Sequence, residues 1–117
     1  MEYKKPTHSI GNENTFKYPL NTDLEIRREL DDLFEHSYKR LLKEDFISKT
    51  VILKIRFSSN ETITRSKTLE IPTDSYEKLK KISDDLLENV NLTNSIRLLG
   101  ISFGNLTKKS VRQLAFF

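Results

Sequence analysis

The fold of this chain is decided by Thr50–Phe57, with the sequence TVILKIRF, and Thr62–Ile71, with the sequence TITRSKTLEI. In the first stretch, apolar residues at every second position alternate with Lys54 and Arg56, as in a strand with one buried face. Ser58–Glu61, SSNE, is a turn signal, and the second stretch is rich in threonine, which favours strands. We therefore expect a β-hairpin that turns Lys54 and Arg56 toward solvent.

Two amphipathic helices are expected around this hairpin. Apolar residues recur at three- and four-residue steps in Asp23–Lys43, which predicts a helix with one buried stripe. A second stripe of the same kind runs through Asp74–Glu88. Pro72 stops the preceding strand, and Asp74–Glu77, DSYE, resembles a capping box begun by aspartate. Both helices can cover the same face of a sheet.

Shorter strand signals lie near the ends of the chain, at Ser9–Phe16 and Ile96–Phe103. The element order is then β-α-β-β-α-β. This order predicts an α+β fold: a four-stranded sheet with both helices packed on one face and the other face open. The expected divisions of the chain are a leader (1–8), a folded domain (9–106) and a flexible C-terminal tail (107–117).

Composition fits one soluble domain. The 117 residues are 36% hydrophobic and 32% charged, with no cysteine, which excludes disulfides and thiolate metal sites. No apolar run is long enough for a membrane span, and the N-terminus lacks the apolar core of a signal peptide, so we expect a cytoplasmic monomer. The net charge of +3 conceals acidic-leaning helices and basic strands, loops and tail. That split fits a polyanion-binding face or, equally, ordinary solvated strands.

The sequence offers little for catalysis. Its two histidines, His8 and His36, lie in the leader and in a helix without a triad-like partner. The acid pairs Asp31-Asp32 and Asp84-Asp85 diverge around their helices and do not converge on a metal. With only three glycines there is no phosphate-cradling loop. We expect no catalytic residue, metal site or cofactor in this chain.

The sequence offers more for binding than for catalysis, because the strands carry cations and short hydroxyls that can contact phosphates. Besides Lys54 and Arg56, these are Arg65, Lys67 and Arg97, with threonine and serine neighbours. The last three share parity with apolar positions, so a bulge is needed to turn them outward. For Arg97 we expect it near Gly100. The alternative is that these are ordinary exposed strand charges.

The tail ends in Gln113–Phe117, QLAFF, after a basic and polar stretch. A terminal segment with leucine and phenylalanine anchors suits docking into a groove of a partner protein. Alternatively, Phe116 and Phe117 fold back onto the domain.

Several stretches together resemble the little finger, the C-terminal DNA-binding domain, of DNA polymerase IV-type Y-family polymerases. Ser9–Phe16, SIGNENTF, is similar to that domain's opening motif, and 49–57 and 62–69 are similar to its second and third strands. Ile96–Ser102, IRLLGIS, resembles its last strand, and QLAFF resembles a clamp-binding pentapeptide. The likeness runs in order from Ser9 to Phe117.

The resemblance implies a sheet that lies in the major groove of primer–template DNA and contacts phosphates without reading sequence. Its implied DNA contacts are Ser9, Gly11, Thr15, Thr64, Arg65, Ser66, Lys67 and Arg97. Its implied contacts with the bacterial sliding clamp (β subunit) are Gln113, Leu114, Phe116 and Phe117. The polymerase palm and its Mg²⁺ are absent, so the chain would be a fragment of a translesion DNA polymerase, with Met1 an added start.

Two residues depart from the family pattern: His8 replaces the usual lysine, and Phe116 replaces the usual leucine. Two other function classes remain open. One is a stand-alone RNA-binding module, which has the same element order and stacks bases on aromatics of its central strands. The other is a clamp-binding adaptor that works only through its tail.

Overall fold

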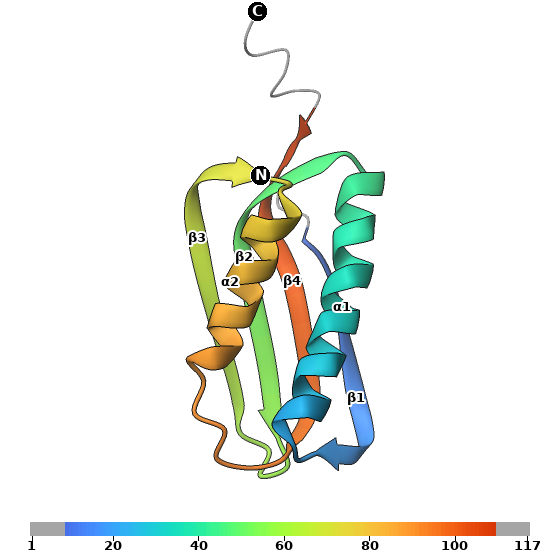
Figure 1. Cartoon of the computed structure of the whole chain (residues 1–117), viewed down its shortest axis with the longest axis vertical. Helices are drawn as coiled ribbons and strands as arrows, with labels where there is room; N and C mark the ends of the chain where they lie inside the picture. The colour runs from blue at the N-terminus through green and yellow to red at the C-terminus, as the bar shows by residue number, and fades with distance from the viewer. Residues whose placement is uncertain (1–8, 110–117) are drawn as a thin grey trace, which may run out of the picture.

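The computed structural model describes residues 9–109 and confirms the predicted α+β fold and element order (Figure 1). Its elements are β1 (Ile10–Leu20), α1 (Asp23–Lys43), β2 (Phe46–Phe57), β3 (Thr62–Thr73), α2 (Tyr76–Glu88) and β4 (Ile96–Lys108). The strands form one sheet in the order β1-β4-β2-β3, and all neighbours are antiparallel. The central strands are therefore β4 and β2, and the free edges belong to β1 and β3.

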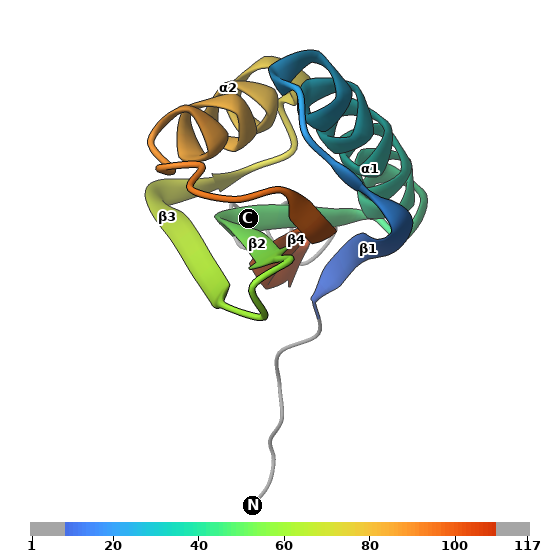
Figure 2. The same ribbon diagram turned by 90° about the horizontal axis from the view of Figure 1, so that it is seen from below.

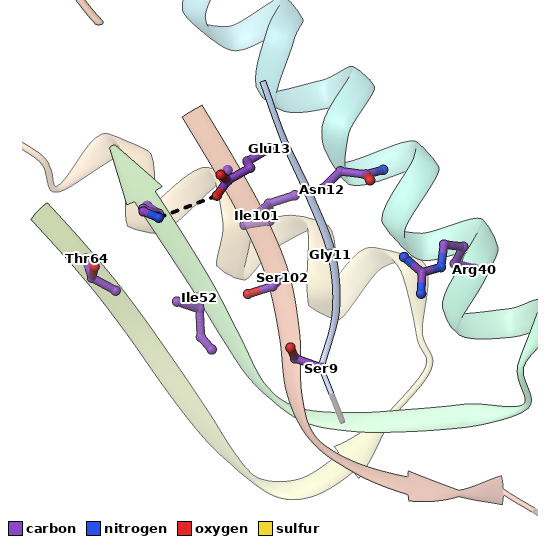
Figure 3. A pocket seen from close by; sticks show the side chains of 11 residues that line it. Ser9, Gly11, Asn12, Glu13, Arg40, Ile52, Thr64, Ile101 and Ser102 are labelled. Atoms are coloured by element: carbon purple, nitrogen blue, oxygen red, sulfur yellow. Dashed lines mark ion pairs between the residues drawn. The ribbon is translucent and has the colours of Figure 1, made fainter. Parts of the chain in front are cut away.

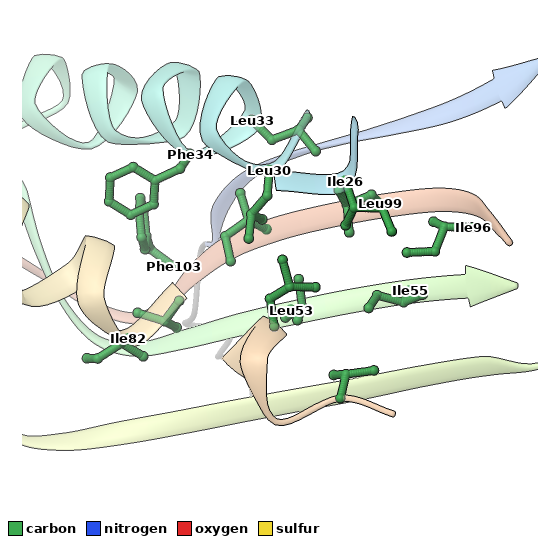
Figure 4. Packing of buried hydrophobic residues seen from close by; sticks show 14 of the residues in the cluster. Ile26, Leu30, Leu33, Phe34, Leu53, Ile55, Ile82, Ile96, Leu99 and Phe103 are labelled. Carbon is green, nitrogen blue, oxygen red and sulfur yellow. The ribbon is translucent and has the colours of Figure 1, made fainter. Parts of the chain in front are cut away.

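Both helices cover one face of the sheet, as Figure 2 shows from the end of the molecule. The covered face is apolar, and its core residues from the central strands include Leu53, Ile55, Leu99 and Phe103, all at most 1% exposed. Phe34 of α1 packs edge-to-face against Phe103, with ring centroids 5.6 Å apart (Figure 4). Within residues 9–109, no helix covers the other face.

The helix starts are fixed by side chains. Thr22 caps α1 in a capping box: its hydroxyl accepts from the Glu25 N–H at 3.1 Å, and the Glu25 carboxylate accepts from the Thr22 N–H. Hydrogen bonds to the carboxylate from the Asn21 N–H, the Thr22 N–H and the Thr22 hydroxyl lower the pKa of Glu25. At α2 the cap is Ser75, which accepts from Lys78 N–H, rather than the predicted Asp74.

The hairpin between β2 and β3 turns at Ser58–Asn60. The Asn60 N–H donates to Phe57 O, and the Phe57 N–H donates to Glu61 O, both at 2.9 Å. Asn60 has φ of 74°, in the left-handed region that asparagine tolerates better than most residues. The turn therefore fixes the register of the hairpin.

All four strands are longer than the sequence pattern indicates. β1 continues from Phe16 to Leu20 after a register shift, β2 begins at Phe46, and β4 runs on to Lys108. β3 continues through Pro72 to Thr73, so the expected stop at Pro72 was wrong. Pairing across the sheet sustains these extensions: Phe46 lies opposite Lys108 on the neighbouring strand. Such pairing is invisible to a local pattern.

Candidate nucleic-acid interface

The open face carries Lys54 and Arg56 as predicted. Both side chains are exposed, and their register partners on β3 are Thr64 and Thr62. Directly opposed residues of an antiparallel pair project to the same side, so these four side chains share the open face. Ser66, opposite Ile52, extends the row. The central part of this face thus combines cations with short hydroxyls.

The backbone of β3 adds donors along the same row. Because the Phe57 N–H bonds to Glu61, ladder alternation directs the N–H groups of Thr64 and Ser66 away from β2, toward the free edge of the sheet. Each of these residues therefore offers a backbone N–H at the edge and a hydroxyl on the open face. That pair of donors suits a phosphate oxygen.

Arg65 and Lys67 lie on the other face of β3. Their partners are Leu53 and Val51, which are core residues, and the register is unbroken between Thr62 and Thr68. The bulge that the sequence argument required for them is absent, and that expectation was wrong. Both side chains are nevertheless exposed, because β3 is an edge strand. They flank the edge instead of joining the open face.

Arg97 is exposed through a bulge, but not at the predicted position. Phe57 pairs with Ile96 and Arg56 pairs with Leu98, so Arg97 is the extra residue of β4. Gly100 pairs regularly with Lys54. The expected bulge near Gly100 was therefore wrong in place, although Arg97 does turn to solvent.

On β1, Gly11 and Thr15 project to the open face, opposite Ser102 and Leu98. Gly11 has a packing role as well. A Cβ there would overlap the Ser102 side chain and lie 2.5 Å from the carbonyl oxygen of Ile101. The close approach of β1 to β4 therefore requires glycine at this position. Ser9 is exposed just before the strand.

A shallow hollow of about 300 Å³ crosses the open face from β3 to β1 (Figure 3). Gly100 and Ser102 of β4 form its floor. Over Gly100, Lys54 Nζ of β2 lies 3.6 Å from Glu13 Oε1 of β1. Because Gly100 has no side chain, these two residues reach each other across the intervening strand. At the β1 end, Arg40 of α1 also lines the hollow.

Ion pairs involve only some cations of each layer. In the helices, Arg27 contacts Asp23 and Glu88 at 2.9 and 2.6 Å, and Lys80 contacts Asp31 and Asp84, both at 2.8 Å. Seven strand cations have no acid partner within residues 9–109: Lys17, Lys49, Arg56, Arg65, Lys67, Arg97 and Lys108. Unpaired cations on an exposed sheet are available to an external polyanion.

Among the residues lining the hollow that sequence reasoning missed are Glu13, Arg40, Gly100 and Ser102. The first, third and fourth stand at alternating strand positions and could have been found from strand parity. Arg40 could not, because its place depends on how α1 packs against the sheet.

Chemistry of other kinds finds no support in the described chain. Residues 9–109 contain no group of three or more metal-ligating side chains, and His36 Nδ1 lies 2.8 Å from the Asp32 carbonyl of its own helix. None of the described helices is long and apolar enough to span a bilayer.

The predicted clamp-binding residues, Gln113, Leu114, Phe116 and Phe117, lie outside the described residues.

Comparison with known proteins defines the class. Residues 7–116 match the model of the impB/mucB/samB family C-terminal domain. The chain therefore belongs to this family, which confirms the resemblance to the little finger of Y-family polymerases.

Two curated relatives of this chain are DNA polymerases. The chain is 38% identical over 115 residues to DNA polymerase IV of Fusobacterium nucleatum, covering 98% of this chain and 33% of the relative. It is 37% identical over 111 residues to DNA polymerase IV of Clostridioides difficile, covering 93% of this chain and 30% of that protein. It thus spans about a third of these polymerases and corresponds to the C-terminal part, not the catalytic region.

Solved structures share the fold. A post-insertion binary complex of Dbh DNA polymerase matches with a TM-score of 0.74 at 17% identity, over 91% of this chain and 32% of that one. A complex of the beta-clamp processivity factor and the little finger domain of PolIV matches with a TM-score of 0.66 at 18% identity. This match covers 82% of this chain and 86% of that one.

Proposed function

We propose that this domain grips duplex DNA through the open face and the two free edges of its sheet, without reading base sequence. The observation that carries the proposal is the row of exposed cations, hydroxyls and outward N–H groups on a sheet face that no helix of residues 9–109 covers. The proposed contacts are Ser9, Gly11, Thr15, Lys54, Arg56, Thr64, Ser66 and Arg97 on or beside the open face, with Arg65 and Lys67 at the β3 edge.

The dimensions support this arrangement. Four strands at about 4.8 Å spacing give a sheet about 14 Å across, close to the ~12 Å width of the major groove of B-DNA. A sheet of this width placed in the groove brings each edge to one phosphate backbone. Ladder alternation directs the N–H groups of Gly11 and Thr15 to the β1 edge, as it does those of Thr64 and Ser66 at the β3 edge.

The test is duplex binding by fluorescence anisotropy over a range of salt. With four to six phosphate contacts, the log–log slope should be about −4 to −5, and Arg56→Gln should make it shallower by about 1. Thr64→Val should weaken binding less, because it removes a hydroxyl and leaves the N–H. An affinity that stays flat between ~50 and ~200 mM salt would contradict the proposal.

The RNA-binding alternative is less well supported. Between Thr50 and Arg56, the open-face residues of the β2–β4 pairing are Thr50, Ile52, Lys54 and Arg56 with their partners Gly104, Ser102, Gly100 and Leu98, and none of them is aromatic. The nearby Phe57 is 2% exposed on the covered face. A base-stacking platform is therefore missing from the central strands. Preference for single-stranded RNA over duplex DNA in the same assay would reverse this ranking.

We further propose that the parent protein is a translesion DNA polymerase of the cytoplasm, whose palm holds the catalytic Mg²⁺, and that the Gln113–Phe117 tail docks on the bacterial sliding clamp. The family membership supports the first point, and the solved clamp complex of a related fold supports the second. The domain itself is proposed to act as a monomer.

Calorimetry of the intact chain and of a chain ending at Arg112 tests the tail. Micromolar clamp binding that disappears on truncation is the expected result, with DNA binding unchanged. Clamp binding by the intact chain with no duplex binding by either chain would instead favour an adaptor that works through the tail alone.

A further inference from the structure

Arg40 lies in α1, one turn before the end of the helix, yet its side chain reaches the β1 edge of the sheet. It lines the same hollow as Ser9, Gly11 and Asn12 of the β1 end (Figure 3). The hollow therefore continues from the open face around the free edge of β1 to the helix layer. A residue of the covering layer is thus placed beside the surface that the sheet offers to DNA.

Most of the hydrogen-bonding capacity of Arg40 is unused. Its Nε donates to Glu44 Oε2 at 3.3 Å, and the side chain is 49% exposed. Within residues 9–109 the two terminal nitrogens of the guanidinium make no hydrogen bond. A guanidinium has five N–H donors in a planar fork, so four remain for an external acceptor. The partly exposed pair with Glu44 is too weak to withhold them.

The strand side of this edge offers complementary donors. The Gly11–Ser102 pair is one of those in which the β1 N–H points away from β4, so the Gly11 N–H faces the free edge. Gly11 has no side chain to shield it, and Ser9 adds an exposed hydroxyl. A guanidinium, a backbone N–H and a hydroxyl at one concave place form a donor set that suits a phosphate.

The nearest acid of the hollow does not cancel this set. Glu13 is held on the open face by Lys54, with the ion pair at 3.6 Å across Gly100. Asn12 is neutral. Apart from Glu44, already paired through Nε, no acid of the described chain forms an ion pair with Arg40.

We propose that Arg40 binds a backbone phosphate at the β1 edge, together with the Ser9 hydroxyl and the Gly11 N–H. This inference rests on the proposed duplex binding and adds to it an anchor that the helix layer supplies. The two edges then grip differently: β1 through a forked guanidinium from α1, and β3 through its own hydroxyls with Arg65 and Lys67 beside them. The β1 edge holds one DNA strand at a fixed point.

The test compares Arg40→Gln with Lys39→Gln in the intact chain, using anisotropy with a labelled duplex. Lys39 is the neighbouring residue of α1, is exposed and does not line the hollow, so the two variants change the net charge equally. We expect Arg40→Gln to weaken binding about three- to tenfold at low salt and to make the salt slope shallower by about 1. Lys39→Gln should leave the slope unchanged. Arg40→Lys should recover the slope but only part of the affinity, since an ammonium lacks the planar fork.

Equal effects of Arg40→Gln and Lys39→Gln would overturn the inference, because they would indicate general charge attraction. Arg56→Gln separates this failure from failure of the proposed function. If Arg56→Gln weakens binding and Arg40→Gln does not, only the β1-edge anchor is wrong. If the intact chain shows no salt-dependent duplex binding, the proposed function itself fails. Far-ultraviolet circular dichroism and a thermal melt confirm that each variant is folded.

Discussion

The two faces of the sheet are built from the same strands and are used in opposite ways. On β4, Leu99 and Phe103 are fully buried beneath the helices, while Gly100 and Ser102, at intervening positions, floor an open hollow. Small side chains on one face and large apolar ones on the other give a firm core under a surface that another molecule can approach. Residues that hold the fold and residues proposed to meet DNA are thus neighbours in sequence but separate in space.

The largest effect should come from the covered face. Phe103→Ala should lower the free energy of unfolding by about 3–5 kcal/mol, because it leaves a cavity beside Phe34. Urea denaturation followed by circular dichroism measures this. Ser102, the neighbour of Phe103 on the open face, provides the control: Ser102→Ala should change the free energy of unfolding by no more than about 0.5 kcal/mol. Similar losses for both would show that the faces are not energetically distinct.

Gly11 should be an exception to the rule that residues of the open face contribute little to stability. It lies on the open face, yet Gly11→Ala should cost about 1–3 kcal/mol of stability, because the new methyl group would press on β4. Gly104→Ala is the matched control, since its Cβ would meet Ile52 Cδ1 at an ordinary 3.5 Å and should be tolerated. Thermal melts of the two variants test this. A tolerated Gly11→Ala would mean that β1 shifts outward easily.

Arg56 should separate binding from folding. Because it is exposed and has no acid partner within residues 9–109, Arg56→Gln should change the unfolding free energy by less than about 0.5 kcal/mol. The same variant should lose duplex affinity. Parallel urea titration and anisotropy give both numbers, and a large stability loss would reveal an unrecognised structural role for the open face.

The smallest effect concerns the capping box at the start of α1. The pKa of Glu25 is lowered from 4.5 by hydrogen bonds from the Asn21 and Thr22 N–H groups. A lowered folded-state pKa means that the stabilisation is present above pH 4.5 and is lost as pH falls through the folded-state value. The stability difference between wild type and Glu25→Gln should therefore shrink in acid. A difference that does not depend on pH would show that the carboxylate charge contributes nothing to the cap.

Local patterns predicted the hairpin, both helices and the element order, because strand and helix periodicities are written into neighbouring residues. They also placed Lys54 and Arg56 on the open face. They failed for Arg65, Lys67 and the site of the β4 bulge. In each case the outcome depends on pairing between distant strands. Ile96 and Leu98 pair with the adjacent residues Phe57 and Arg56, so Arg97 between them has no partner on β2.

The sequence by itself determined which residues alternate and where the turn falls. Only the tertiary structure decided which strands lie at the edges, that Glu13 and Lys54 meet across Gly100, and that Arg40 stands beside β1. The physical reason is separation along the chain, because alternation and capping involve residues only a few positions apart. The order β1-β4-β2-β3 is set by burying two helical stripes and one sheet face together.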